Sequence, residues 1–337
     1  MEYTTTFNDL CADLLLNIFE FFTLNEIYYS FHEVIPYLTS LLVNSKARLR
    51  MCDLIIPEVQ PTIVASLELQ YLSRSSSPLL SDFINLRSLV LHDMEDPWLI
   101  INQNFAESLE RLYLNISLRN KNTIIAEFLS FVFRLSKLKY FTIIYPSSYF
   151  IIQEDSFILP KLSTTIESLK LDVKCSMLCL DKLLKYLPSI RHLHATVAFT
   201  EENIEIYSRA SVFPTVQYLF LSWEYIPIQD VIRFCQTMPC LRQCTLDATD
   251  YRDDQDLFYP NTWQQFIEHD HSMLKKFQVN MTRKPSHDFH RNSHWLSLNH
   301  NPYFREINFK FKMDNWGNTI LNGNYAKLRY RLHDLRV

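Results

Sequence analysis

The hexamer LRSLVL occupies residues 86–91, and LERLYL follows it at residues 109–114. Both hexamers have apolar residues at their first, fourth and sixth positions, an alternation that predicts a short strand with one buried face. Eight further hexamers of this kind begin at residues 64, 138, 166, 190, 216, 241, 274 and 304. Consecutive hexamers begin 22 to 33 residues apart, and ten of them near a common period indicate a repeat architecture.

Amphipathic segments stand between several of these hexamers, and Pro188 and Pro239 directly follow two of them. Their apolar stripes predict helices packed against neighbouring repeats, at residues 124–135, 178–187, 228–238 and 263–269. The order strand, turn, helix predicts an α/β fold with parallel strands. Residues 51–337 therefore resemble the leucine-rich-repeat family. The resemblance implies a horseshoe-shaped solenoid of about ten repeats, with helices on its convex side.

The turns depart from that family's pattern. The family has Asn or Cys two residues after the third apolar position, whereas such places here hold Met94, Ser117, Lys174 and Ala198. The whole chain has only two glycines, so the turns are built from other residues, such as those at 92–94 and 145–147. We therefore expect irregular repeats, in which other interactions satisfy the turn backbone.

The first 50 residues predict a separate helical domain. Asn8 and Asp9 suit a helix start, and the apolar residues that follow form a continuous stripe. Thr23 and Glu26 match a capping box that begins a second helix. Pro36 suits the first turn of a third helix.

These three short helices resemble the F-box family. The likeness is carried by Leu10 and Cys11 at the family's Leu-Pro position, by residues 13–15 and 18–19, and by Val34 and Leu38 where Val and Trp usually stand. It implies docking to the Skp-type adaptor of a cullin-RING ubiquitin ligase. The implied adaptor contacts are Leu10, Leu14, Leu15, Ile18, Phe19, Phe22, Leu24 and Leu38. The alternative is that these side chains only pack the protein's own core.

The strand alternation also identifies the side chains opposite the buried face. They include aromatic and imidazole groups on neighbouring strands, and aromatic side chains dominate the energetics of many interfaces. We therefore expect a protein substrate to bind at Arg111, Tyr113, Tyr140, Lys170, His192, His194, Tyr218, Phe220, Lys276 and Lys310. The alternative is that these exposed aromatics have no binding role.

Several chemistries are not indicated. Two glycines cannot supply a phosphate-binding loop or a dinucleotide fingerprint, and nothing marks a nucleophile or general base. We therefore expect neither an enzyme nor a cofactor. His287, His290 and His294 lie in one polar segment, and the acidic segment 247–256 lacks the glycine of a calcium loop, so no metal site is predicted. The seven cysteines form no C-x-x-C pair, which favours reduced, mostly buried thiols.

Charge differs between the two ends of the chain. Residues 1–45 carry six acidic and no basic residues, whereas residues 275–337 carry 4 acidic and 12 basic residues. This asymmetry indicates two surfaces with different partners. The start of the chain lacks a secretory signal, and the longest uncharged stretch, residues 140–153, is too short to cross a membrane. We expect a cytoplasmic or nuclear protein.

The leading hypothesis is a substrate adaptor: the helices recruit the Skp-type adaptor and its cullin scaffold, and the repeats bind a protein substrate that the sequence does not identify. One alternative is a leucine-rich-repeat interaction scaffold without a ligase role. Another is a nucleic-acid binder acting through the basic C-terminal end, although the sequence contains no groove-reading motif.

Overall fold

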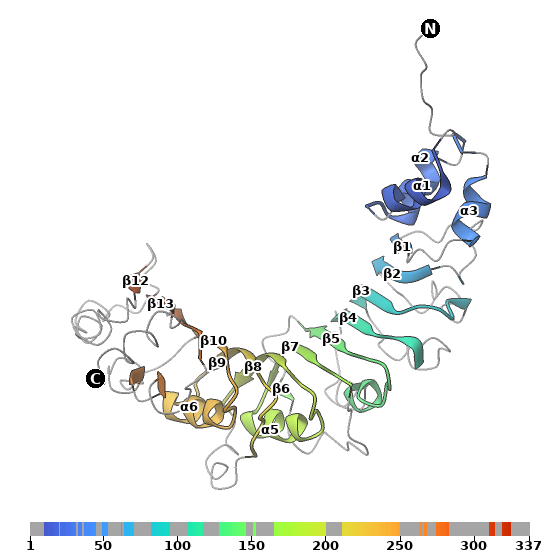
Figure 1. Cartoon of the computed structure of the whole chain (residues 1–337). Coiled ribbons are helices and arrows are strands. Elements are labelled where there is room, and N and C mark those ends of the chain that lie inside the picture. Colours follow the sequence, from blue (N-terminus) through green and yellow to red (C-terminus); the bar gives the residue numbers. More distant parts are fainter. Residues whose placement is uncertain are drawn as a thin grey trace, which may run out of the picture. The chain divides into compact units, whose positions relative to one another are not determined.

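The structure is a computed structural model of the whole chain (Figure 1). It describes residues 10–19, 21–31, 33–35, 37–44, 49–52, 62, 64–70, 82–94, 107–116, 128–145, 151–152, 165–199, 211–249, 263–264, 266–267, 274–282, 310–313 and 319–324. The chain divides into two compact units, Met1–Pro146 and Ser147–Val337. The helices and the first five strands share the first unit, and the predicted domain boundary at residue 50 stays a prediction.

The first unit opens with three short helices, as the sequence predicts. They are α1 (Ala12–Phe19), α2 (Leu24–Phe31) and α3 (Leu38–Asn44). The capping box is confirmed, because the Thr23 amide donates to Glu26 Oε2 at 2.7 Å and the Glu26 amide donates to Thr23 Oγ1 at 3.2 Å. These two bonds satisfy amides that the first turn of α2 leaves without helical partners.

The strands of the first unit are parallel and follow one another in chain order. Helix α2 packs against the first of them. The five strands are β1 (Leu49–Cys52), β2 (Val64–Gln70), β3 (Ser88–Met94), β4 (Arg111–Ile116) and β5 (Tyr140–Ile144).

The second unit continues the same design. Strands β7 to β11 are parallel neighbours in chain order, the short β6 pairs with β7, and β13 pairs antiparallel with both β11 and β12. The strands are β6 (Ile151–Ile152), β7 (Ser168–Cys175), β8 (His192–Ala198), β9 (Tyr218–Glu224), β10 (Gln243–Thr249), β11 (Lys276–Thr282), β12 (Lys310–Met313) and β13 (Thr319–Asn324).

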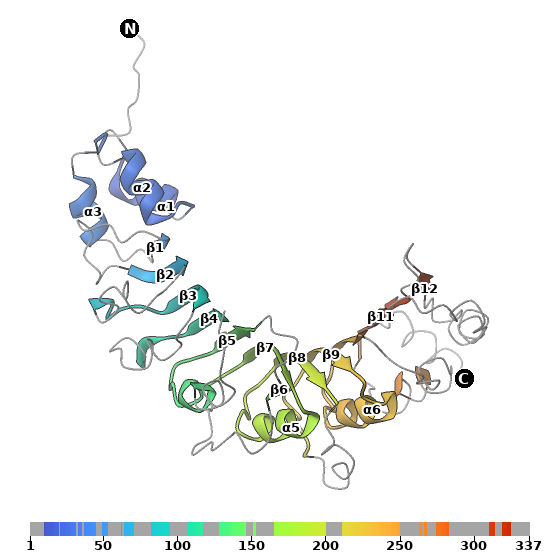
Figure 2. The ribbon, with the colours of Figure 1, turned by 180° about the vertical axis from the view of Figure 1, so that it is seen from behind.

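Two helices of the second unit cover one face of its sheet. Helices α5 (Met177–Lys185) and α6 (Ile228–Gln236) lie on the same side of β7 to β10 in both views (Figures 1 and 2). Both overlap predicted helices, and residues 128–132 of the first unit form a further helical turn within a predicted segment. The prediction of an α/β protein with parallel strands is confirmed.

The core forms as the hexamers predict. In β9, Leu219 and Leu221 are buried, whereas Tyr218 and Phe220 between them are only half-buried. The same alternation recurs in β4, β5, β7 and β8. Nine of the ten hexamers overlap a strand, and the tenth, residues 304–309, lies outside the described residues.

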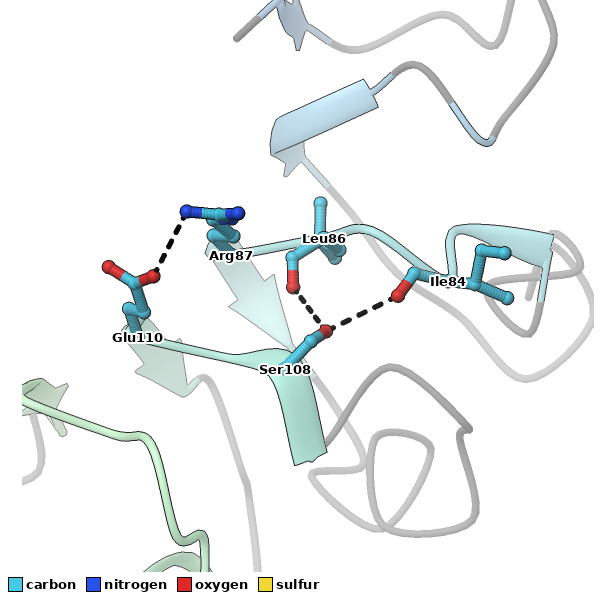
Figure 3. Close-up of polar contacts among 5 residues, drawn as sticks. All are labelled: Ile84, Leu86, Arg87, Ser108 and Glu110. Carbon is cyan, nitrogen blue, oxygen red and sulfur yellow. Dashed lines mark hydrogen bonds and ion pairs between the residues drawn. The ribbon is translucent and has the colours of Figure 1, made fainter. Parts of the chain in front are cut away.

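Neighbouring repeats are joined by polar side chains at a position that the sequence analysis did not single out. At three hexamers, the residue directly before the hexamer donates to a backbone carbonyl of the preceding repeat. Ser108 Oγ lies 2.7 Å from the Leu86 oxygen and 3.4 Å from the Ile84 oxygen (Figure 3). Equivalent bonds run from Asn85 Nδ2 to Thr62 O at 2.7 Å and from Thr215 Oγ1 to Pro188 O at 3.0 Å.

The backbone adds a second repeated contact between strands. The Arg191 oxygen accepts from the amides of Gln217 and Tyr218, and the Gln217 oxygen accepts from those of Arg242 and Gln243. Six carbonyls at the second position of a hexamer accept from two amides of the next repeat in this way. This contact and the polar side chains align neighbouring repeats without the family's usual Asn or Cys.

The expected irregularity occurs at the C-terminal ends of two strands. The pairing register shifts between Leu91 and Met94 in β3, and between Leu171 and Lys174 in β7. Asp93 has φ 51°, in the left-handed region that glycine favours. An aspartate thus makes the tight turn in a chain that has almost no glycine.

Candidate partner-binding surfaces

Exposed apolar side chains concentrate on the helices of the first unit. Six of the eleven large hydrophobic side chains that are exposed among the described residues lie between residues 14 and 37. We call this set the apolar head surface, and its members are Leu14, Phe21, Phe22, Tyr29, Val34 and Tyr37. Phe21 is 87% exposed and Leu14 is 44% exposed. Large exposed apolar patches often mark interaction sites, and these six side chains share one short segment of the chain.

The structure divides the predicted adaptor contacts into two groups. Leu14 and Phe22 are exposed, and Leu10 and Ile18 are half-buried. The remaining predicted contacts are buried in the protein's own core, and this corrects their assignment to a docking surface: they are Leu15, Phe19, Leu24 and Leu38. One side of α1 therefore packs into the core, with Leu15 and Phe19, and another side, with Leu14, faces solvent.

The aromatic side chains of the helices explain this division. The Phe31 ring lies 5.4 Å from the Phe19 ring and 6.2 Å from the Phe22 ring, measured between centroids. Phe19 is buried, whereas Phe22 remains 41% exposed. Phe31 thus contacts both the buried Phe19 and the exposed Phe22. Phe21, which the sequence analysis did not include among the contacts, is the most exposed apolar side chain of the set.

The first unit carries three of the predicted substrate residues on its sheet. The Arg111 guanidinium lies over the Tyr140 ring, 4.8 Å from its centroid, in cation–π geometry. The Tyr113 ring lies 5.4 Å from the His92 ring, and His92 Nε2 lies 3.1 Å from Glu68 Oε1. The strand pairing thus brings Arg111 and Tyr140 together, and Tyr113 lies beside His92, which was not among the predicted residues.

The second unit carries two stacked pairs of predicted substrate residues on neighbouring strands. The rings of His192 on β8 and Tyr218 on β9 stack at 4.4 Å between centroids and 10° between planes. The next outward pair, His194 and Phe220, stacks at 4.1 Å and 22°. The register places each ring directly opposite its partner. Two parallel stacks therefore run side by side along β8 and β9.

His194 has an electrostatic environment of its own. Burial lowers its pKa below the usual value, and Lys170 on β7 lowers that pKa further, whereas Asp172 on the same strand opposes both effects. The imidazole is therefore held neutral, and a neutral ring stacks on Phe220 without the cost of desolvating a charge.

Basic residues gather at the N-terminal edge of the second unit's sheet. This basic edge consists of Arg191, Arg242, Lys275 and Lys276, at the second and third positions of their hexamers. The Arg242 oxygen accepts from the amides of Lys275 and Lys276, so these three residues are direct neighbours. One carboxylate, Glu167, precedes β7 at the equivalent position. Of these four residues, only Lys276 was predicted as a site residue. Arg191, Arg242 and Lys275 all stand at the second position of their hexamers, and this shared position could have identified them.

The C-terminal edge of the same sheet is acidic. Lys174 Nζ and Glu224 Oε2 form an ion pair at 2.6 Å that is largely shielded from solvent. Asp172 and Asp247 are half-buried on β7 and β10, and burial raises the pKa of Asp247 above its usual value. The two edges of one sheet thus carry opposite charge.

Two exposed aromatic side chains stand beside this acidic edge. Phe199 and Tyr225 directly follow β8 and β9, and they are 40% and 43% exposed. The Phe199 amide donates to the Glu224 oxygen at 3.0 Å, so the two strand ends lie side by side. Tyr225 has φ 57°, a backbone conformation that is energetically unfavourable for a bulky residue. The chain thus turns sharply at Tyr225.

The last predicted substrate residue, Lys310, is the first residue of β12. The structure gives its backbone position within that strand, and the predicted residues therefore fall on three elements: the sheet of the first unit, the outward face of β7 to β11, and β12.

Most cysteines of the described residues lie in the core. Cys175, Cys179, Cys235 and Cys244 are buried and free. A hydrogen bond with Cys175 and burial raise the pKa of Cys179, and burial together with a hydrogen bond to Cys235 raises that of Cys244. Both thiols are thus held protonated, the unreactive form.

Among the described residues, no three or more His, Cys, Asp or Glu side chains gather as a metal site. The segment with His287, His290 and His294 lies outside them. No helix in the described part of the chain has the length and hydrophobicity to span a membrane.

No protein-family model matches the sequence, and no curated protein is significantly similar to it. The partner assignments that follow therefore depend on the surfaces themselves.

Proposed function

We propose that the chain is the substrate adaptor of a Skp–cullin–F-box type ubiquitin ligase. The apolar head surface docks the Skp-type adaptor, and the outward face of the repeats holds a protein substrate. The mechanism is positional, because holding a substrate near the ubiquitin-carrying enzyme raises its effective concentration without a catalytic residue in this chain.

The observation that carries the proposal is the concentration of exposed apolar side chains on the helices. A helical segment whose core is already filled by Leu15, Phe19 and Leu24 has no internal use for an exposed Leu14 and Phe21. Burial of such side chains is the main favourable contribution to association. The capping box supports the proposal because it fixes α2, and with it the exposed Tyr29.

Affinity purification of the full chain tests the proposal. We expect a Skp-type adaptor and a cullin to be recovered with the wild-type protein, and to be lost with the double variant Leu14→Asp and Phe21→Asp. Both side chains are exposed, so these changes spare the core. Asn17→Asp, an exposed change on the same helix, is the matched control and should preserve recovery. Absence of the adaptor from the wild-type sample, with the protein folded, would refute the ligase role.

One observation favours the second candidate, an interaction scaffold without a ligase role. Helix α2 packs against β1, so the helices also cover the end of the sheet, as the terminal caps of repeat proteins do. On this alternative, the wild-type chain recovers a repeat-bound protein without any cullin.

A further inference from the structure

A stripe of outward side chains runs along β8 and β9. It begins with the His192–Tyr218 stack and continues with the His194–Phe220 stack. Thr196 and Ser222 follow opposite each other, and the exposed Phe199 and Tyr225 stand just beyond the ends of the two strands. Both strands are seven residues long. At roughly 3.3 Å per residue, the stripe is about 23 Å long and matches about seven residues of extended chain.

The charges at the two ends of this stripe differ in sign. Four basic residues and one carboxylate, Glu167, lie at the N-terminal edge, and Lys170 adds a positive charge beside His194. At the C-terminal edge, Lys174 and Glu224 neutralise each other in their ion pair. Asp172 and Asp247 lie just past the middle of β7 and β10 and supply the negative charge of this half. The surface is therefore positive at one end, aromatic over the first half of the strands and negative toward the other end.

We propose that this stripe binds an extended peptide segment of about seven residues that is acidic at one end, apolar or aromatic at its centre and basic at the other end. The acidic end pairs with Arg191 and Arg242. The central side chain lies on the two stacks, and the basic end lies between Asp247 and the rings of Phe199 and Tyr225, where cation–π contact adds to charge pairing.

Charge complementarity favours a peptide over a nucleic acid. A single strand of nucleic acid would stack bases on the rings and place phosphates against the basic edge. Its backbone is negative throughout its length, however, so its far end would lie against Asp172 and Asp247. A peptide can reverse its charge within seven residues, whereas a polynucleotide cannot.

This inference deepens the substrate-binding half of the proposed function and rests on it. Adaptor recovery reports only on the apolar head surface, so the two can fail separately. Loss of peptide binding with intact adaptor recovery counts against the stripe alone, and the reverse result counts against the ligase role alone.

Selection from a displayed library of random nonapeptides tests the inference, with the full chain as bait. The enriched pool should show acidic positions at one end, an aromatic or large apolar centre and basic positions at the other end. The double variant Arg191→Glu and Arg242→Glu should enrich a pool in which the acidic positions have become basic. Arg233→Glu is the matched control, because Arg233 is exposed on α6, the helix side of the sheet. It should enrich the wild-type pool.

Fluorescence anisotropy then measures one selected peptide. We expect at least about tenfold weaker binding to the double variant, and recovery when the peptide's acidic residues are exchanged for lysine. Circular dichroism verifies that each variant is folded. No enrichment, a pool without the charge pattern, or a pool unaltered by the double variant would overturn the inference. Preferential binding of an oligothymidylate that competes with the selected peptide would also overturn it.

Discussion

Removal of the Ser108 hydroxyl gives the sharpest test of how the repeats are joined. In Figure 3, this hydroxyl lies between the carbonyl oxygens of Leu86 and Ile84, at 2.7 Å and 3.4 Å. The first distance is ideal for an O–H···O bond, whereas the second lies beyond the usual range. Ser108→Ala therefore loses one good bond, and we expect the free energy of unfolding to fall by about 1 kcal/mol.

The neighbouring ion pair supplies a matched comparison. Arg87 Nη1 and Glu110 Oε1 lie 3.4 Å apart, with side chains 49% and 33% exposed. Solvent and salt screen such a pair, so Arg87→Ala should cost less than about 0.5 kcal/mol. The half-buried serine should thus matter more than the more visible ion pair.

Urea unfolding of the full chain measures both variants. With a slope of about 1–3 kcal/mol per molar urea, the Ser108→Ala midpoint should fall by roughly 0.3–1 M. Hydrogen exchange should place the loss of protection at residues 82–94 and 107–116. Ser108→Thr keeps the hydroxyl and should retain most of the stability. An unchanged midpoint for Ser108→Ala, or a larger loss for Arg87→Ala, would contradict the role assigned to this position.

Two further predictions concern titratable groups. In the native protein, a small alkylating reagent should modify the exposed Cys11 and spare Cys179 and Cys244, whose raised pKa values keep them protonated; mass spectrometry of the labelled peptides checks this. The lowered pKa of His194 means that the unfolded chain binds a proton more readily than the folded one, so this residue's contribution to stability should fall as the pH drops below about 6.5. Thermal unfolding at pH 7.5 and 5.5 should show a smaller difference for His194→Asn than for the wild type, and an equal difference would refute this assignment.

The strands could be predicted because the apolar alternation within each hexamer indicates which of its side chains are buried. An apolar residue at the fourth and sixth positions has one available environment, the core, and Leu219 and Leu221 are buried for that reason. The outward position of Tyr218 and Phe220 then follows from the geometry of a strand. The capping box could also be predicted, because its hydrogen bonds join Thr23 and Glu26, which are only three residues apart in the sequence.

The head surface could be predicted only in part. An apolar stripe does not reveal how much of it the chain buries in its own core, and Phe19 and Phe22 differ in exposure because Phe31 packs differently against each. The inter-repeat bonds were missed for another reason. The small polar residue before a hexamer is an ordinary turn residue by composition, and it becomes informative only once the alignment of repeats places Asn85, Ser108 and Thr215 in one row.

The short last strand of the described sheet has a consequence for self-association. A series of parallel strands has two unlike ends, and the free edge at one end of a copy fits the free edge at the opposite end of another, which permits open-ended filaments. Strand β13 is antiparallel to both β11 and β12, so β12 runs in the same direction as β11. Strand β12 has only four residues, and so short a strand offers an incoming chain few backbone hydrogen bonds, which limits continued strand addition at β12.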